Sequence, residues 1–212
     1  MNSLADFKLL NVADTCALWN LLGSPSLHRA SKKVGVSVCG TQFVRYECLF
    51  KAGANSPAWI ELRSRLHSCV KSKEIMFCDI DLEDLQEVAA LEGRMAISKG
   101  ELSTIAFAKR TGQSFLSDDR QAKVLARSVL TAESIQDIPH LCGWLCANDV
   151  LHESDASTIR AELKTLQRYL DPHIANAFRG ALELKLMRQM ENQTVPNDHT
   201  VDNDSAPSEA ER

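Results

Sequence analysis

The chain has 212 residues, of which 44% are hydrophobic and 25% are charged, and its formal net charge is −4 at neutral pH. This length allows one full hydrophobic core with a smaller appendage, and the composition is that of a globular protein. No apolar run approaches the roughly 20 residues that a helix needs to cross a bilayer. Asp6 and Lys8 interrupt the N-terminal stretch before a signal core forms. We therefore expect a cytoplasmic protein without a membrane partner.

The negative charge is concentrated near the C-terminal end of the sequence. Residues 191–212 hold six acidic residues and one basic residue, whereas residues 1–190 hold 22 acidic and 23 basic residues. The acidic tail has no apolar cluster, so we expect it to be disordered. If several acids of residues 1–190 gather in one site, the remaining surface is mildly basic. Such a surface permits a nucleic-acid partner without requiring one.

The seven cysteines are odd in number and scattered, and no pair has the Cys-x-x-Cys spacing. This pattern indicates neither a disulfide framework nor a zinc ribbon. Cys142 and Cys146 are four residues apart, but His140 is the one further metal-ligating side chain near them in the sequence. We interpret the cysteines as buried, reduced thiols.

Strand-like and helix-like segments alternate through the first 150 residues. The strand-like segments are short and apolar or β-branched, and they span residues 8–13, 34–40, 75–80, 115–116 and 134–138. Helix-like segments lie between them, and Thr41 is the predicted N-cap of one. This alternation predicts an α/β fold with three α/β/α layers around a mostly parallel sheet.

Beyond residue 153 the pattern changes to two amphipathic helices at 157–170 and 173–190, separated at Asp171–Pro172 because proline cannot continue the first helix. We expect these helices to complete the core. Binding of a partner protein or self-association are the alternatives, which exposure of Phe178 or Leu182 would indicate. The chain thus divides into three parts, which are a main domain at 1–152, a helical extension at 153–190 and a disordered tail at 191–212.

One stretch, residues 97–126, combines acidic side chains with a clear helix–strand–helix pattern. Glu101 falls in the first turn of the predicted helix, and Gly112 falls where that helix ends, because glycine adopts the left-handed C-cap conformation without strain. Asp118 and Asp119 then follow a short strand and precede another helix. Ligands and chemistry collect at the carboxyl ends of strands in open α/β sheets. Acids delivered there by separate elements indicate a metal site.

Each acid taken alone also has an ordinary explanation. Asp14 and Asp119 occupy N-cap positions, Glu101 can complement a helix dipole, and Glu47 can lie on a solvated helix face. Their equivalent placement shifts the balance: Asp14 and Asp119 follow two different strands, and Glu101 opens the helix that leads to the second strand. We therefore expect all four to meet in one site.

Three segments make the sequence similar to the PIN-domain nucleases over residues 7–150, and these segments are VADTCALWNLL, YECL and KGELSTIAFAKRTGQSFLSDDRQAKVLA. The resemblance implies a PIN-like α/β/α fold and four catalytic acids, Asp14, Glu47, Glu101 and Asp119. Ser117 matches the family's hydroxyl position, and Asp118 is an additional acid. The sequence departs from the family at Glu101, where aspartate is commoner.

The resemblance and the acids together predict a metal-dependent endoribonuclease that acts on single-stranded or structured RNA. Hard Mg²⁺ or Mn²⁺ ions bind carboxylate oxygens, and two such ions can activate water and stabilise the leaving oxygen of a phosphodiester. The expected metal ligands are Asp14, Glu101, Asp118 and Asp119. The expected substrate-binding residues are Thr15, Ser117, Arg120, Lys99 and Lys123. The nearby bases Lys109, Arg110 and Arg127 are further candidates for steering phosphates, with a solvated charged face as the alternative for every base.

Three other functions remain open from the sequence. The first is a catalytically weak PIN-like domain that binds or regulates a partner, with the acids as a structural cluster. The second is a DNA or flap nuclease. The third is a toxin-like or defence ribonuclease restrained by an antitoxin, although such toxins are usually shorter than this chain.

Overall fold

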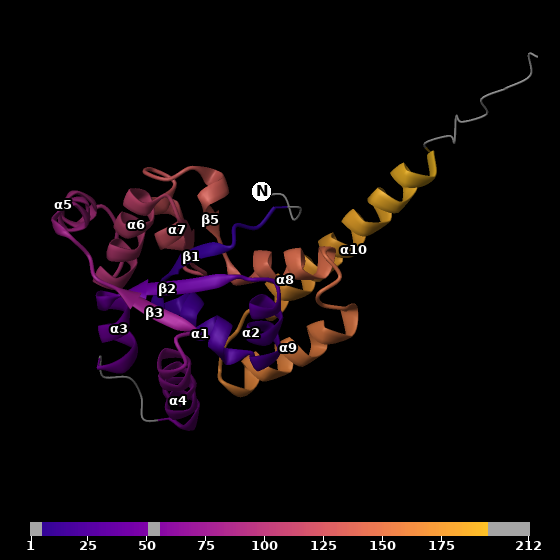
Figure 1. Cartoon of the computed structure of the whole chain (residues 1–212), viewed down its shortest axis with the longest axis horizontal. Coiled ribbons are helices and arrows are strands. Elements are labelled where there is room, and N and C mark those ends of the chain that lie inside the picture. Colours follow the sequence, from indigo (N-terminus) through magenta and orange to yellow (C-terminus); the bar gives the residue numbers. More distant parts are fainter. Residues whose placement is uncertain (1–5, 51–55, 195–212) are drawn as a thin grey trace, which may run out of the picture.

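The computed structural model describes residues 6–50 and 56–194, which contain a sheet of five parallel strands (Figure 1). The strands are β1 (Leu10–Ala13), β2 (Ser37–Thr41), β3 (Ile75–Cys78), β4 (Ser114–Leu116) and β5 (Ile135–Gln136). Their order in the sheet is β3-β2-β1-β4-β5, and every neighbouring pair is parallel. The predicted α/β fold is confirmed, and the sheet is parallel throughout rather than mostly parallel.

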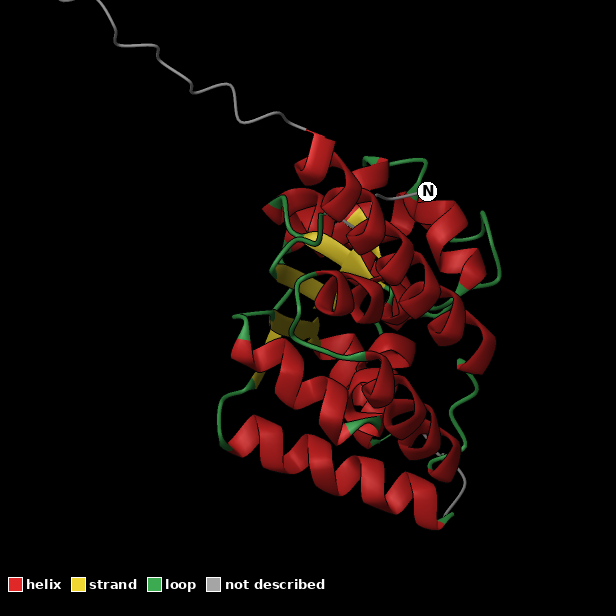
Figure 2. Ribbon diagram, turned by 90° about the vertical axis from the view of Figure 1, so that its right-hand side faces the viewer, coloured by secondary structure: helices red, strands yellow, loops and turns green. Residues whose placement is uncertain are grey.

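Helices cover both faces of the sheet and give the three predicted layers (Figure 2). The helices of the main domain are α1 (Thr15–Gly23), α2 (Pro25–Lys33), α3 (Gln42–Leu49), α4 (Pro57–Lys71), α5 (Leu82–Leu91), α6 (Lys99–Thr111), α7 (Arg120–Ala126) and α8 (Ile138–Ala147), with a 3₁₀ turn η1 (Ala132–Ser134). The extension adds α9 (Glu153–Thr165) and α10 (Asp171–Thr194).

The central strands are buried on both faces, and their successive side chains alternate between two apolar clusters. Val12 of β1 and Phe115 of β4 pack with α5, α6 and α7. The next residue of each strand, Ala13 and Leu116, packs with the helices of the opposite layer. This alternation is the two-residue period of a strand, and burial on both faces explains why most side chains of these segments are apolar.

Local signals fix several element ends as predicted. The Thr41 side chain accepts the Val44 N–H and caps α3, and Gly112 ends α6 in the left-handed conformation with φ 67°. Four of the five strands are shorter than their predicted segments, whereas β4 begins one residue earlier than predicted, at Ser114. β2 begins only at Ser37, because Gly35 (φ 80°) first turns the chain out of α2.

The extension differs from its prediction at its helix boundaries. α9 begins at Glu153, earlier than predicted, and it ends at Thr165 before the left-handed residue Gln167 (φ 56°). Pro172 does not separate the two helices. It lies in the first turn of α10, where a missing N–H costs no hydrogen bond and the fixed φ suits the helix.

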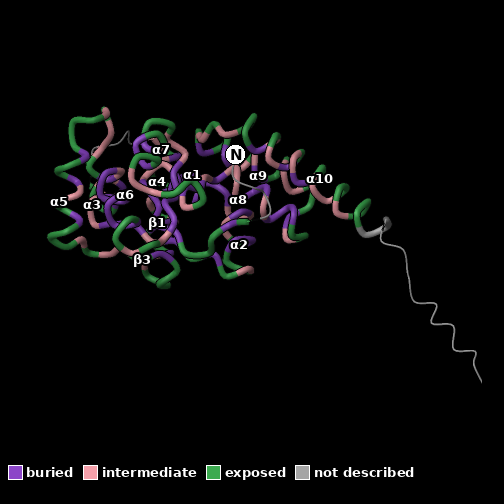
Figure 3. Tube along the Cα trace, turned by 90° about the horizontal axis from the view of Figure 1, so that it is seen from above, coloured by how far each residue is buried: buried purple, intermediate pink, exposed green. Residues whose placement is uncertain are grey.

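The extension shares the core of the main domain, as expected. Ile159, Leu163, Ile174 and Phe178 are buried in the same cluster as the side chains of α1 and α8. Figure 3 shows buried positions, in purple, in the region where α8 and α9 lie. Burying one such side chain stabilises a protein by about 1.5–3 kcal/mol. Phe178 is therefore not the exposed residue that would indicate a partner, and Leu182 is half-buried.

The distal part of α10 runs beyond the body of the molecule (Figure 1), and Leu186 and Met187 are exposed there. The helix continues to Thr194, so residues 191–194 are helical where a disordered tail was expected. The rest of that expectation, residues 195–212, lies outside the described residues. Within the described ranges, no helix combines the length and the apolar character needed to cross a membrane.

Candidate functional site at the carboxyl ends of the central strands

The predicted acids lie where the strand order of the sheet reverses. The chain leaves β1 towards β2 and β3 on one side and returns to β4 on the other side of β1. Asp14 directly follows β1, and Asp118 and Asp119 follow β4. Because β1 and β4 are parallel neighbours, these residues lie at the same edge of the sheet. This is the switch point at which open α/β sheets bind their ligands.

Asp14 is fully buried and holds two elements together. Its Oδ1 accepts the Ala17 N–H at 2.8 Å, which caps α1. Its Oδ2 accepts a short hydrogen bond from the Ser117 hydroxyl, and its N–H donates to the Leu116 carbonyl at 3.1 Å. The predicted hydroxyl position, Ser117, therefore orients the first acid rather than facing solvent; it is itself fully buried.

Glu47 and Glu101 reach the site from α3 and α6. Glu101 forms a capping box with Ser98: its carboxylate accepts the Ser98 N–H at 2.6 Å, and its own N–H donates to the Ser98 hydroxyl. The Glu47 carboxylate accepts the Thr15 hydroxyl at 2.6 Å and the Gly100 N–H at 3.2 Å. These bonds tie α1, α3 and the first turn of α6 together.

Gly100 is required for the approach of α6 to Glu47. A Cβ atom on Gly100 would lie within 2.9 Å of all three atoms of the Glu47 carboxyl group. The absence of a side chain lets the backbone N–H at the start of α6 donate directly to Glu47. Gly100 therefore allows the contact with Glu47, and the residue that follows it, Glu101, is itself one of the predicted acids.

The two aspartates after β4 point to different partners. Asp119 caps α7 by accepting the Ala122 N–H at 2.8 Å, and its own N–H donates to the Ser117 hydroxyl at 3.1 Å. Asp118 accepts the Asn20 side-chain amide at 2.7 Å and the Ile138 N–H at 3.0 Å. Asp119 therefore stays with Ser117, whereas Asp118 connects the site to α1 and α8.

The acids lie close enough to influence one another's protonation. Burial raises the pKa of Asp14 from its ordinary value of 3.8 to about 7, and the charges of Asp118 and Glu101 act in the same direction. Burial also raises the pKa of Glu101, with further contributions from Asp119 and Glu47. All five acids therefore belong to one electrostatic cluster, which we call the acid cluster.

Asp118 shows the same behaviour at the other side of the acid cluster. Burial raises its pKa to about 6, and the charge of Asp137 adds to that effect, although the Asn20 hydrogen bond opposes it. Elevated carboxylate pKa values mean that the negative charge of the cluster is incompletely compensated by the protein. A bound cation would supply that compensation.

The ordinary explanations hold for three of the acids. Asp14 and Asp119 are N-caps, and Glu101 belongs to a capping box. In the described part of the chain, the one set of three metal-ligating side chains with ligand atoms all within 4.8 Å of one another is a different set. The acid cluster is therefore not a tight protein cage for one ion. Mg²⁺ seldom uses such a cage, since it keeps several waters and takes one or two carboxylates.

The predicted basic residues lie in different surroundings, and not all of them lie near the acids. Lys123 donates to Asp137 at 2.7 Å, Lys99 is exposed and lies 3.9 Å from Glu92, and Arg120 is exposed beside Asp119 in the sequence. Two further candidates lie in the last turn of α6, whereas Glu101 lies in its first turn. Lys109 pairs with Glu87 and Arg110 pairs with Asp84, about two and a half turns of helix from Glu101.

Two residues of the site were not predicted from the sequence, Asn20 of α1 and Arg168 of the extension. Asn20 is buried and donates to Asp118, and its carbonyl oxygen accepts the Arg168 Nε–H at 2.6 Å. An Arg168 Nη group also lies 3.4 Å from the Cys16 sulfur. The extension thus delivers a guanidinium to the border of the acid cluster.

A comparison of the chain with protein-family models, with curated proteins and with solved structures finds no match.

Proposed function

We propose that this protein is a metal-dependent nuclease that hydrolyses phosphodiester bonds in RNA, as an endoribonuclease. The observation that supports the proposal is the acid cluster itself. Carboxylates from the β1–α1 turn, α3, α6 and the β4–α7 turn lie around the switch point, where burial and the neighbouring acids raise the pKa of Asp14 and Glu101. A cluster with this charge and this donor type suits a hard divalent cation.

The residues that would hold Mg²⁺ or Mn²⁺ are Asp14, Glu101 and Asp119, with Asp118 beside them. The donor set fits these ions because every donor is a carboxylate oxygen. When bound, the ion supplies Lewis acidity, which lowers the pKa of water and stabilises the leaving oxygen of a phosphodiester. The protein fixes the carboxylates beforehand through Ser117 and Ser98, so little reorganisation accompanies catalysis.

An exposed aromatic pair favours single-stranded RNA as the substrate. Tyr46 lies on α3, the helix that carries Glu47, and Phe50 is the C-cap residue of that helix; they are 59% and 68% exposed. Their rings stack on each other at a centroid distance of 6.1 Å and an interplanar angle of 29°. Proteins bind single strands by stacking bases on such exposed rings, at about 1–3 kcal/mol per base. The pair would give an unpaired base a platform on the element that carries Glu47.

A gel assay tests the proposal. Purified full-length protein is incubated with RNA and with DNA of the same sequence, with Mg²⁺, with Mn²⁺ and with EDTA. We expect cleavage of RNA that EDTA abolishes. Asp149→Asn is the matched control, because this aspartate is exposed and has φ 59°, a conformation that asparagine tolerates. Cleavage of DNA alone would redirect the proposal to a DNA nuclease.

The capping roles of the acids favour a second function, a PIN-like domain that binds or regulates a partner without cleaving nucleic acid. A thermal melt with increasing Mn²⁺ separates the two functions, since a cation that binds the folded state raises the melting temperature. A melting temperature that Mn²⁺ leaves unchanged, together with intact RNA, would support the binding module. A cytoplasmic location, an antitoxin and a partner for the extension stay predictions.

A further inference from the structure

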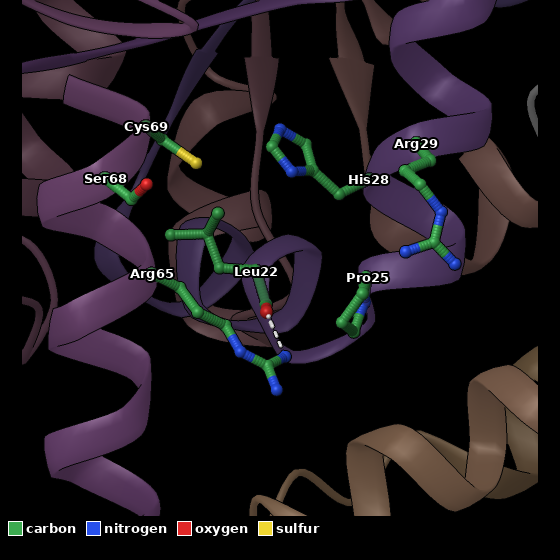
Figure 4. Close-up of a pocket in the computed structure, with 7 residues that line it drawn as sticks. All are labelled: Leu22, Pro25, His28, Arg29, Arg65, Ser68 and Cys69. Atoms are coloured by element: carbon green, nitrogen blue, oxygen red, sulfur yellow. Dashed lines mark hydrogen bonds between the residues drawn. The ribbon is translucent and has the colours of Figure 1, made fainter. Parts of the chain in front are cut away.

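A second polar cluster lies at the opposite end of the sheet from the acids. His28 belongs to α2, Cys69 belongs to α4, and Glu74 immediately precedes β3 at the amino ends of the strands. One nitrogen, the sulfur and one carboxylate oxygen of these residues all lie within 4.8 Å of one another. His28 Nε2 and Glu74 Oε2 are 3.9 Å apart. Figure 4 shows the His28 ring and the Cys69 sulfur pointing towards each other.

The turn that ends α4 brings Cys69 and Glu74 together. The Glu74 N–H donates to the Cys69 carbonyl at 2.8 Å, and the Lys73 N–H donates to the Val70 carbonyl at 3.1 Å. Lys73 has φ 60°, so the three observations define a Schellman C-cap. In this motif the residues at the Cys69 and Glu74 positions usually make an apolar contact. Here the same positions present a thiol and a carboxylate.

A cavity of about 250 Å³ opens beside the cluster (Figure 4). His28 and Cys69 line its wall, together with Arg65 and Pro25. A ligand bound between the three side chains would therefore remain reachable from solvent through this cavity. The acid cluster is not part of it, because its lining comes from α2, α4 and the end of α1.

The donor types are those of a zinc site. Zinc takes imidazole nitrogen, thiolate sulfur and carboxylate oxygen at about 2.0–2.3 Å, so tetrahedral ligand atoms lie about 3.3–3.8 Å apart. The 3.9 Å between His28 and Glu74 is close to that spacing. Lys32 binds the other Glu74 oxygen, Oε1, at 2.5 Å. Such an outer partner orients a ligating carboxylate and need not be displaced.

We propose that His28, Cys69 and Glu74 bind Zn²⁺ or a chemically similar borderline divalent cation, with water from the cavity in the fourth position. Three protein ligands plus water is an established coordination for zinc in proteins. The mixed N, S and O donors disfavour Mg²⁺, which prefers oxygen alone. This site does not depend on the proposed nuclease activity. It ties α2 to the α4–β3 turn at an edge strand of the sheet.

Metal titration of the full-length chain tests this site. Zn²⁺ is titrated against a chromophoric chelator, and Co²⁺ is added separately because a thiolate ligand gives it a charge-transfer absorption band. We expect one Zn²⁺ per chain and a Co²⁺ band that Cys69→Ser removes. His28→Gln should weaken zinc binding by more than the roughly 10–100-fold that outer-partner changes cost. Asp14→Asn should leave zinc binding unchanged.

His67→Ala is the matched control, because His67 lies on the same helix two residues from Cys69 but is exposed on another face. It should bind zinc as the natural chain does. Thermal melts show whether each variant is folded, and two different ligand variants guard against the failure of one. Zinc affinity that stays equal to that of the natural chain in a folded His28→Gln or Cys69→Ser protein would overturn the proposal.

Discussion

The two ends of one parallel sheet carry polar clusters of opposite electrostatic character. At the carboxyl end, burial and mutual repulsion raise the pKa of Asp14 and Glu101. At the amino end, Lys32 lowers the pKa of Glu74 through a direct ion pair, and burial lowers the pKa of His28. In the second cluster Lys32 pairs directly with the carboxylate, whereas Arg168 and Lys123 lie only at the border of the first. A cation is thus expected to change stability and activity at the first cluster far more than at the second.

The largest expected effect is on RNA cleavage, and it tests whether the acid cluster is the catalytic site. Asp14→Asn or Asp119→Asn should lower cleavage by several kcal/mol of transition-state stabilisation, on the order of a thousandfold. Asparagine keeps the N-cap at each position, so folding should persist. Cleavage rates and circular dichroism of the same preparations provide the measurement. Full activity in either folded variant would remove the acid cluster from the mechanism.

The second effect is the pH dependence of stability in the absence of metal. Because folding raises the pKa of Asp14 from 3.8 to about 7, the folded state binds this proton more tightly than the unfolded state does. Stability should therefore be highest below about pH 4 for this group and fall as the pH rises to 7, by up to roughly 4 kcal/mol. Asp118 acts in the same direction between 3.8 and about 6.

Urea unfolding at a series of pH values measures this slope. Asp14→Asn should flatten the profile, because its side chain does not titrate. Saturating Mg²⁺ or Mn²⁺ should offset the loss near neutral pH, since the ion binds the folded state. A profile with the same slope in the variant as in the natural chain would show that Asp14 does not carry the effect.

The third prediction concerns a displacement of the Glu47 carboxylate that leaves its charge in place. In Gly100→Ala the new Cβ meets the Glu47 carboxyl group, which is the movable end of its side chain. Stability should change by only about 1 kcal/mol, because alanine also favours the helix. A displaced carboxylate should nevertheless lower cleavage by about a hundredfold. In a Glu47→Ala background the same substitution should have little further effect, and additive losses would contradict this coupling.

The fold was predictable because its signals are local. The apolar runs at β1 and β4, the N-cap residues and Gly112 each act within a few residues, and the β-α alternation leaves few topologies. The acids were predictable for the same reason, since Asp14 and Asp119 follow strands that must end at the same edge. Strand lengths were less predictable, because the turn at Gly35 removes residues that look β-like from β2.

The remaining site residues depend on packing between distant segments, which no local pattern records. Arg168 reaches Asn20 across 148 residues of sequence, and only the docking of α9 makes that contact. Glu162 holds α9 in place by accepting hydrogen bonds from Ser24 and Ser26 at the start of α2. The amphipathic pattern predicted that α9 would pack on something. The pattern contained no information on which surface α9 would cover.

The smallest effect concerns Arg168, which tests whether the extension serves the acid cluster or only the core. Its guanidinium borders a cavity of about 150 Å³ that Lys164 and Tyr169 also line, and Tyr169 is 77% exposed. Arginine has five N–H donors, and the bonds to Asn20 and Cys16 engage only part of them. We expect the remainder to contact a phosphate of the RNA.

Arg168→Gln should therefore weaken RNA binding about tenfold, or 1.4 kcal/mol. The slope of log affinity against log salt should fall by about 0.7, as for one lost phosphate contact on a single strand. Arg168→Lys should restore the salt slope, because the charge returns, while the bond to Asn20 is not reproduced. Arg179→Gln removes the same charge from an exposed position on α10 and is the matched control. If Arg168→Gln lowers stability but leaves the salt slope at its original value, the extension acts on the acid cluster through packing alone.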